Sequence, residues 1–287
     1  MKNQHTNHLL LLTLATFLIS TSGALGRFID LPTPVIIWWR SSLGALFLFL
    51  FCRFKKIDLK IRSRRDFFTF LLSGVFLGSH WITYFYALKL SNVALGMLSL
   101  FTFPIITAFL EPLFTRSKLS FVHIILGLMV LLGIYILAPE FDFESTYVKG
   151  ILFGVFSAVC YALRNLILKP YVSNYNGSAL MMHQTLFLTV LLLPVLFLMD
   201  TGNTTSQLPY LLILALVTTA IGHSLFVMSL KHFSVSTASI ISTTQPIFGI
   251  IIAYIFLNEM PTLNTFIGGS LILATVIIES IRSKKYA

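Results

Sequence analysis

Arg40 is the most chemically distinctive side chain within the apolar stretches of this sequence. It stands in "WWRSS", about seven residues into its stretch, which is roughly 10 Å along a helix. A guanidinium offers a planar fork of donors to a carboxylate or phosphate, so Arg40 is a candidate anchor for an acidic ligand. It could equally extend outward or bond carbonyls at a helix end. Trp38 and Trp39 favour an interfacial position, and Trp39 is also a candidate cavity residue.

A second group of polar side chains stands in "HWITYFY", residues 80–86. His80 and Tyr84 are four apart and share a helix face, while Trp81 and Tyr84 share an adjoining edge. Such a face suits the wall of a cavity that stacks on a planar or amphiphilic solute. Ordinary helix packing, with His and Tyr donating to neighbouring carbonyls, is the alternative for any one of them.

The second half of the chain holds a comparable set of polar side chains in its apolar stretches. Arg164 is a few residues from the end of its stretch and is expected to extend to the boundary, and the role of Asn165 is left open. Lys89 and Lys231 are interpreted as boundary charges. The remaining candidates for a cavity wall are Tyr161, His183, Gln184, His223 and Gln245.

These residues do not indicate a catalytic site. No HExxH, GxSxG or CxxC motif occurs, and His80, His183 and His223 fall in three different stretches without an acidic partner. We therefore predict no enzyme activity, no bound metal and no cofactor. No Asp or Glu is expected near the middle of a stretch, so proton coupling would have to use a histidine. Facilitated diffusion is at least as well supported.

The composition is that of a membrane protein. Apolar residues make up 56% and charged residues 10% of the chain, against about 25% charged in a soluble domain. The net charge of +10 does not indicate a nucleic-acid partner, because the bases cluster in short loops between apolar stretches. Cys52 and Cys160 both stand in apolar stretches and suggest no disulfide framework.

Ten stretches are long enough to cross a bilayer as helices, which takes about 20 residues each. A signal peptide in place of the first is the alternative, and its cleavage would leave nine helices. The expected spans are 9–29, 34–52, 67–88, 92–114, 121–138, 150–169, 178–199, 208–230, 236–257 and 263–281.

The distribution of bases predicts the orientation. With a cytoplasmic N-terminus, fifteen of the 20 Lys and Arg residues fall inside and three outside, seven of the inner ones in the loop 53–66. Cytoplasmic loops carry this excess of bases. We predict a multi-pass protein of the cell (inner) membrane with both termini in the cytoplasm.

The two halves of the chain resemble each other. Residues 86–137 and 228–279 align without gaps at 11 identical positions of 52, among them Lys89/Lys231, Pro104/Pro246 and Gly127/Gly269. We expect five helices in 1–145 and five in 146–287. Because five is odd, the second half would enter the membrane from the opposite side. Such an inverted repeat permits alternating access to a site near the midplane, although a duplicated chain could also be a static scaffold.

Pro104 and Pro246 fall in mid-span and are expected to bend the fourth helix of each half. A proline removes a backbone donor and frees the carbonyl four residues earlier, here those of Leu100 and Ser242. Thr102 and Thr244 could satisfy loosened backbone groups. We expect each bend to open or close one end of a transport path.

These features resemble the EamA branch of the drug/metabolite transporter superfamily. The likeness covers nearly the whole chain and is carried by residues 87–114 and 229–273. Pro246, Glu259 and Gly269 resemble the closing pattern of the family, whereas Ser117 replaces the expected glutamate in the first half. The resemblance implies ten helices around a central cavity and export of small metabolites, without naming the substrate.

We therefore expect a carrier that exports small metabolites, with aromatic or apolar amino acids as the leading class. A nucleotide-sugar or phosphate-ester antiporter and an exporter of amphiphilic drugs are alternatives, and the antiporter would need several buried bases. A membrane enzyme and a channel are less well supported. The expected partners are a small-molecule substrate and the lipid bilayer, with no nucleic acid, and the protein would be a monomer or homodimer.

Overall fold

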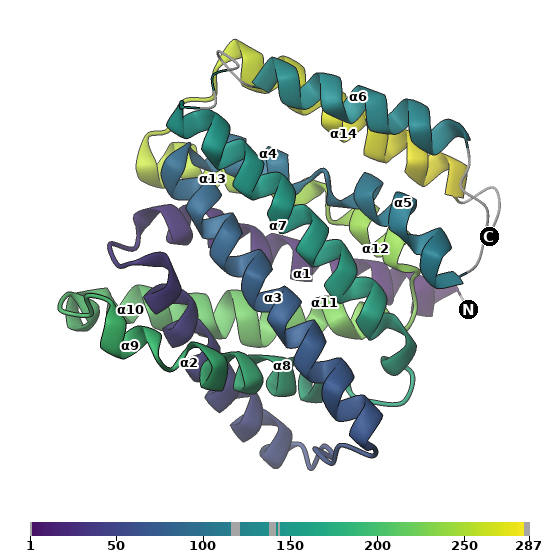
Figure 1. Ribbon diagram of the computed structural model, residues 1–287. Helices are drawn as coiled ribbons and strands as arrows, with labels where there is room; N and C mark the ends of the chain where they lie inside the picture. The colour runs from purple at the N-terminus through teal and green to yellow at the C-terminus, as the bar shows by residue number, and fades with distance from the viewer. Residues whose placement is uncertain (1, 116–120, 138–141, 143, 284–287) are drawn as a thin grey trace.

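The computed structural model of the protein is all-α and describes residues 2–115, 121–137, 142 and 144–283 (Figure 1). Short polar side chains begin several helices, because they accept backbone N–H groups that lack an intrahelical partner. Asn92, for example, accepts a hydrogen bond from Leu95 N at 2.8 Å. The first half contains α1 (Lys2–Phe28), α2 (Thr33–Phe54), α3 (Arg64–Leu90), α4 (Val93–Leu100), α5 (Phe103–Thr115) and α6 (Phe121–Leu137).

The second half contains more segments, because several of its spans are interrupted. Its helices are α7 (Thr146–Leu168) with the short η1 (Lys169–Tyr171), α8 (Gly177–Leu192), α9 (Val195–Leu198), α10 (Thr204–Ile213), η2 (Leu214–His223), α11 (Ser224–Ser229), α12 (Val235–Ile241), α13 (Thr244–Leu257) and α14 (Leu263–Ser283).

The described helices account for all ten predicted spans. Seven apolar segments of 22 to 27 residues, some of them made of consecutive shorter helices, are long enough to cross a membrane, and three shorter apolar helices, 124–137, 244–257 and 263–278, complete the set. The expected all-α architecture of ten spans is therefore confirmed.

The fourth span of each half is broken rather than bent. Helix α4 ends at Leu100 and α5 begins at Phe103, and α12 and α13 are separated in the same way at 242–243. Pro104 and Pro246 lie in the first turn of α5 and α13, where the missing N–H costs nothing. The expected continuous helix with a kink was wrong, because the chain leaves the helix before each proline.

The carbonyls at the second break are not all free. Ser242 O accepts a hydrogen bond from Gln245 N at 2.9 Å, which corrects the expectation that this oxygen is unpaired. The two matched threonines do bond the loosened backbone, as predicted. Thr102 Oγ1 donates to Ser99 O at 2.8 Å, and Thr244 Oγ1 donates to Ile241 O at 3.2 Å.

Helix packing follows one pattern in both halves. Helix α3 packs on α7, and the corresponding pair α1 and η2–α11 is also in contact. Likewise α7 packs on α4 and α5, and α1 packs on α13. Equivalent spans of the two halves also pack on each other: α2 on α8, the two fourth spans through the matched contacts α4–α13 and α5–α12, and α6 on α14, the last along the top of Figure 1. Exchanging the halves thus leaves these contacts unchanged.

Contacts between helix ends show which ends share a side of the molecule. At one end, the His8 ring at the start of α1 stacks on His232 with 3.6 Å between ring centroids. Lys169, at the end of α7, donates to Phe233 O at the same end. The start of α1 and the end of α7 therefore lie together, so that these two helices run in opposite directions.

Candidate functional site

A small central cavity lies where both halves meet. Its free volume is about 20 Å³, which is room for one water molecule and far too little for a metabolite. The structure is therefore a closed form in which helices must separate before a solute can enter. The lining residues are Ile19, Ser22, Arg40, His80, Trp81, Tyr84, Leu100, Phe101, Phe103, Tyr161, His223 and Gln245.

Arg40 lies at this cavity and points into the protein. Its side chain is 1% exposed, and its Cζ lies 3.8 Å from the centroid of the Trp81 ring. Nε donates to Thr219 Oγ1 at 2.7 Å and Nη2 donates to Thr218 Oγ1 at 3.3 Å. These bonds use two of the five N–H groups of the guanidinium, and both acceptors are neutral.

The two threonines reach Arg40 because of the unusual winding of η2. This segment forms hydrogen bonds between residues five apart, and such segments are frequent at functional sites. Thr218 and Thr219 both bond Leu214 O, and both hydroxyls reach the same guanidinium. No pattern in the sequence indicated this wide turn, and the two threonines were not predicted as site residues.

His80 is fixed in one tautomer by Ser157. The Ser157 hydroxyl donates to His80 O at 2.8 Å, and its oxygen lies 2.7 Å from His80 Nδ1. Since a hydroxyl has a single hydrogen, Nδ1 must carry a proton and donate. A neutral His80 ring then presents Nε2 as an acceptor. The ring also stacks on Tyr161, with 4.4 Å between centroids.

Three polar atoms of the cavity wall, one of them the Tyr84 hydroxyl, lack a hydrogen-bond partner among the described residues. The other two are Trp81 Nε1, a donor, and His223 Nδ1. Both side chains are nearly fully buried, and their rings meet edge to face at 5.4 Å. A buried polar atom without a partner costs free energy, so these two atoms suit a solute that bonds them.

Not all predicted site residues line this cavity. The cavity brings together Arg40, His80, Trp81 and Tyr84 from the first half with residues 161, 223 and 245 from the second. Trp39 instead packs against Trp38. His183 lies beside Phe70, and Gln184 bonds Arg164 and Ser73. These three predicted residues therefore stand outside the wall.

Arg164 does not extend to the membrane boundary, which corrects the expectation for it. Its side chain is fully buried in the contact between α7 and α8. Nε and Nη2 both donate to Gln184 Oε1, at 3.2 and 2.5 Å, and Nη1 donates to Asn165 Oδ1 at 2.9 Å. Because η1 prolongs the helix to Tyr171, Arg164 lies about seven residues from the end, as deep as Arg40 is from the start of α2.

The two buried arginines have no buried carboxylate beside them. Among the side chains that the structure describes, no Asp or Glu is buried. Within the same residues, no three His, Cys, Asp or Glu side chains are grouped as metal ligands. The interior charge is therefore positive, which favours an anionic group in the cavity.

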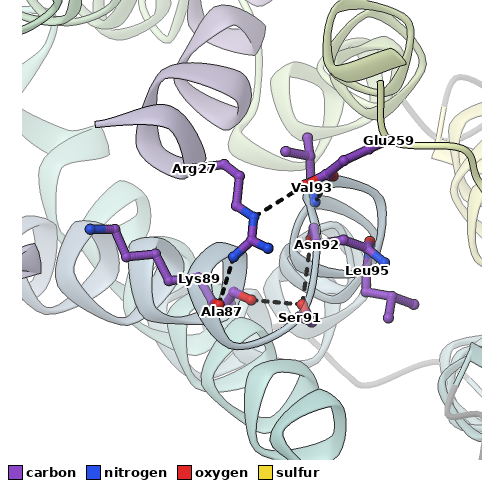
Figure 2. Close-up of polar contacts among 8 residues, drawn as sticks. All are labelled: Arg27, Ala87, Lys89, Ser91, Asn92, Val93, Leu95 and Glu259. Carbon is purple, nitrogen blue, oxygen red and sulfur yellow. Dashed lines mark hydrogen bonds and ion pairs between the residues drawn. The ribbon is translucent and has the colours of Figure 1, made fainter. Parts of the chain in front are cut away.

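An ionic cluster ties the halves together at one end of the molecule (Figure 2). Arg27, at the end of α1, pairs with Glu259 with 3.1 Å between Nε and Oε1, and donates from Nη1 to Lys89 O at 2.7 Å. The second oxygen of Glu259 accepts from Val93 N, the first residue of α4, at 2.8 Å. We call Arg27 and Glu259 with these contacts the latch.

The "NE" pair at 258–259 explains how Glu259 reaches the other half. Asn258 has φ 55°, a left-handed conformation that ends α13 and that asparagine tolerates well. The chain therefore turns back, and Glu259 meets the N-terminus of α4, where a carboxylate is stabilised. Ser117, which replaces the glutamate in the first half, lies outside the described residues.

Comparison with known proteins agrees with this architecture. The model of the EamA-like transporter family matches residues 6–138 and 148–281, two copies that together span nearly the whole chain. This chain belongs to the EamA-like transporter family. It is therefore a multi-pass integral membrane protein and a membrane transporter, as the sequence led us to expect.

Individual relatives are distant but cover the full length. The pseudopaline exporter CntI of Pseudomonas aeruginosa is 26% identical over 282 residues, which is 96% of either chain, in strains UCBPP-PA14 and PAO1. A solved structure titled "Crystal structure of protein" matches with a TM-score of 0.73 over 98% of this chain and 99% of its own, at 17% identity. That likeness shows the fold alone.

Proposed function

We propose that this EamA transporter exports small metabolites that carry a carboxylate, with amino acids as the best single class. The observation that carries the proposal is Arg40, a buried cation at the central cavity with only neutral partners. A guanidinium with unused donors and no counter-ion binds a carboxylate well. Export is supported by CntI, the relative that is named an exporter.

The aromatic wall supports a solute with a planar or apolar part. Trp81, Tyr84 and Tyr161 line the cavity beside Arg40, and Phe101 and Phe103 close it from the broken span. Aromatic faces stack on planar groups and also attract an ammonium group. The cavity thus suits both the carboxylate and the ammonium group of an amino acid, and the ammonium group needs no buried carboxylate of the protein as its partner.

Alternating access is supported by the contacts at the two ends of the molecule. Helices α1 and α7, which are equivalent in the two halves and both line the cavity, run in opposite directions, and the latch holds one end of the molecule. At the other end Lys169 donates to the carbonyls of Leu230 and Phe233 at the end of α11. We propose that the latch and the Lys169 contact open in turn, in two halves inverted in the membrane.

Counterflow in proteoliposomes tests this function. Vesicles preloaded with a pool of unlabelled amino acids would receive labelled Phe, Leu, Thr or Lys on the outside. Transient accumulation of one label, absent from empty vesicles, is the expected result and names the class. If folded and inserted protein accumulates none of them, amino acids are excluded as the substrate class.

A phosphate-ester antiporter is the second candidate, and one observation favours it. Such a carrier needs several buried bases, and Arg164 adds a second fully buried guanidinium to Arg40. Labelled phosphate esters in the same counterflow assay separate the two candidates.

A further inference from the structure

We propose that the cavity prefers solutes with two acid groups, one bound at Arg40 and the other balanced by the charge of Arg164. This deepens the function proposed above and rests on it. The starting observation is that the interior holds two fully buried guanidinium groups and, among the described side chains, no buried Asp or Glu.

The hydrogen bonds of Arg164 are satisfied, but its charge is not. All its hydrogen-bond partners among the described residues are neutral: the amide oxygens of Gln184 and Asn165 and the sulfur of Met181. A buried ion without a counter-ion costs several kcal/mol, and hydrogen bonds to amides offset only part of that. An anionic solute group would stabilise Arg164 more than any of these partners does.

Arg164 does not line the cavity, and we propose that its positive charge acts on a solute there at a distance. Asn165, which it bonds, lies beside Tyr161, and Tyr161 lines the cavity and stacks on His80. Arg164 is therefore linked through Asn165 and Tyr161 to the side chains of the cavity wall. In a water-poor interior a buried charge acts over several ångströms. Arg164 is thus a positioning and selectivity residue.

Gln184 offers a sharp test because its amide oxygen already receives two N–H groups of Arg164. Gln184→Glu would place a carboxylate at that oxygen and neutralise Arg164 within the protein. The shape of the side chain is nearly unchanged, and the hydroxyl of Ser73 can turn to donate to the new oxygen. The matched control is Gln207→Glu, because Gln207 only accepts a weak contact from Asp30 N at 3.4 Å on the exposed surface.

Two pairs of solutes test the effect of the second acid group on transport. Glutamate and glutamine differ in one charge at constant shape, and phosphoserine and serine provide a phosphate as the other source of the charge. The readout is the ratio of accumulation within each pair in counterflow, which does not depend on the amount of working protein. A preference in the first pair indicates dicarboxylates, and a preference in the second pair alone indicates phosphate esters.

The wild type is expected to favour the acidic member of a pair. Gln184→Glu and Arg164→Gln should lower that ratio by about ten- to hundredfold, the effect of losing one charge-assisted interaction, and Gln207→Glu should leave it unchanged. If Arg164→Gln does not fold, the accumulation ratio measured with Gln184→Glu tests the inference without it. Equal accumulation within both pairs, or a ratio that Gln184→Glu leaves intact, would overturn the inference while transport stands. Accumulation of labelled phenylalanine but of none of these four labels would overturn the inference while the proposed function stands.

Discussion

At the scale of single residues, the cavity derives its character from one cation and a wall of rings. Arg40 is held between the Trp81 ring and the hydroxyls of Thr218 and Thr219, so its direction is fixed before a solute arrives. Fixing a binding group in advance removes an entropic cost from binding. The same contacts make lysine a poor substitute, because an ammonium cannot stack flat on a ring or present a fork of donors.

Substitution of Arg40 is therefore expected to weaken solute binding. Arg40→Lys should raise KM for transport by about ten- to hundredfold, as expected for losing a charge-assisted hydrogen bond, and Arg40→Gln by at least as much. Initial rates of counterflow over a range of solute concentrations give KM and the maximal rate. Arg62→Gln, in the exposed loop before α3, is the control for loss of one positive charge. An unchanged KM in both Arg40 variants would exclude this residue as the anchor.

Polar residues in apolar stretches could be found from the sequence because each needs a physical reason to be there. That principle selected seven residues that the structure brings to one cavity. It failed for Arg164, because the extension of α7 by η1 and the pairing with Gln184 of α8 are tertiary features. It also could not show that His183 faces Phe70 instead of the cavity.

At the scale of helices, the latch connects three of them at one end of the closed form. The ion pair is part-exposed, with side-chain exposure of 35% for Arg27 and 22% for Glu259. Such pairs contribute about 0.2–1 kcal/mol, enough to shift a conformational equilibrium without locking it. This is the size expected of a contact that must break in every transport cycle.

Removing the charge of Glu259 should favour opening at the latch. Ser22, which is buried at the cavity, would be replaced by cysteine in a protein whose Cys52 and Cys160 are replaced by alanine. In sealed vesicles, an impermeant maleimide added from the latch side should then label position 22 about two- to fivefold faster in Glu259→Gln.

The control for this labelling is Glu144→Gln. It removes an ion pair of the same 3.1 Å length, between Glu144 and Lys149, that lies on the surface at the start of α7. Equal labelling rates in Glu259→Gln and in this control would show that the latch does not hold the cavity closed.

The breaks before Pro104 and Pro246 are expected to act as joints. Alanine at either position restores the missing N–H and removes the penalty of about 3 kcal/mol that proline carries inside a helix, so that the two segments can join. The variants should lower the maximal transport rate severalfold with little change in KM. The same rate measurements check this, with Pro112→Ala in α5 as the control. Unchanged rates would argue against a moving joint.

The sequence predicted the existence of these breaks but not their form. Proline in mid-span and matched threonines indicated a bend, and the length of the apolar stretches indicated helices on both sides. Whether the chain bends or leaves the helix depends on packing against α7 and α1, which no local pattern records. The wide winding of η2 is a case of the same kind.

At the scale of the whole molecule, the fold followed from composition, span length and internal repetition. Lipid has no water to satisfy backbone groups, so apolar stretches of this length must be helices. The repeat then predicted two equivalent halves. In the structure, the main helix contacts have counterparts when the two halves are exchanged. The closed state of the cavity could not be predicted, because it is one of several arrangements open to the same helices.

In the proposed mechanism, two inverted halves around a cation-bearing cavity determine which solutes can bind. The solute would bring a carboxylate to Arg40, because the described residues that line the cavity include no Asp or Glu, and its aromatic or apolar part would replace water in the cavity. A neutral analogue of the same shape lacks only the carboxylate. Comparing its transport with that of the acid therefore distinguishes a carboxylate carrier from a nonselective one.

The most direct measurement compares a transported amino acid with its amide in counterflow. Phenylalanine and phenylalaninamide would be offered as labels to vesicles preloaded with the unlabelled amino acid pool, with the wild type and Arg40→Gln side by side. We predict that phenylalanine accumulates transiently in the wild type, that the amide does not, and that Arg40→Gln abolishes the difference. Equal accumulation of both labels by the wild type would contradict a carboxylate site at Arg40.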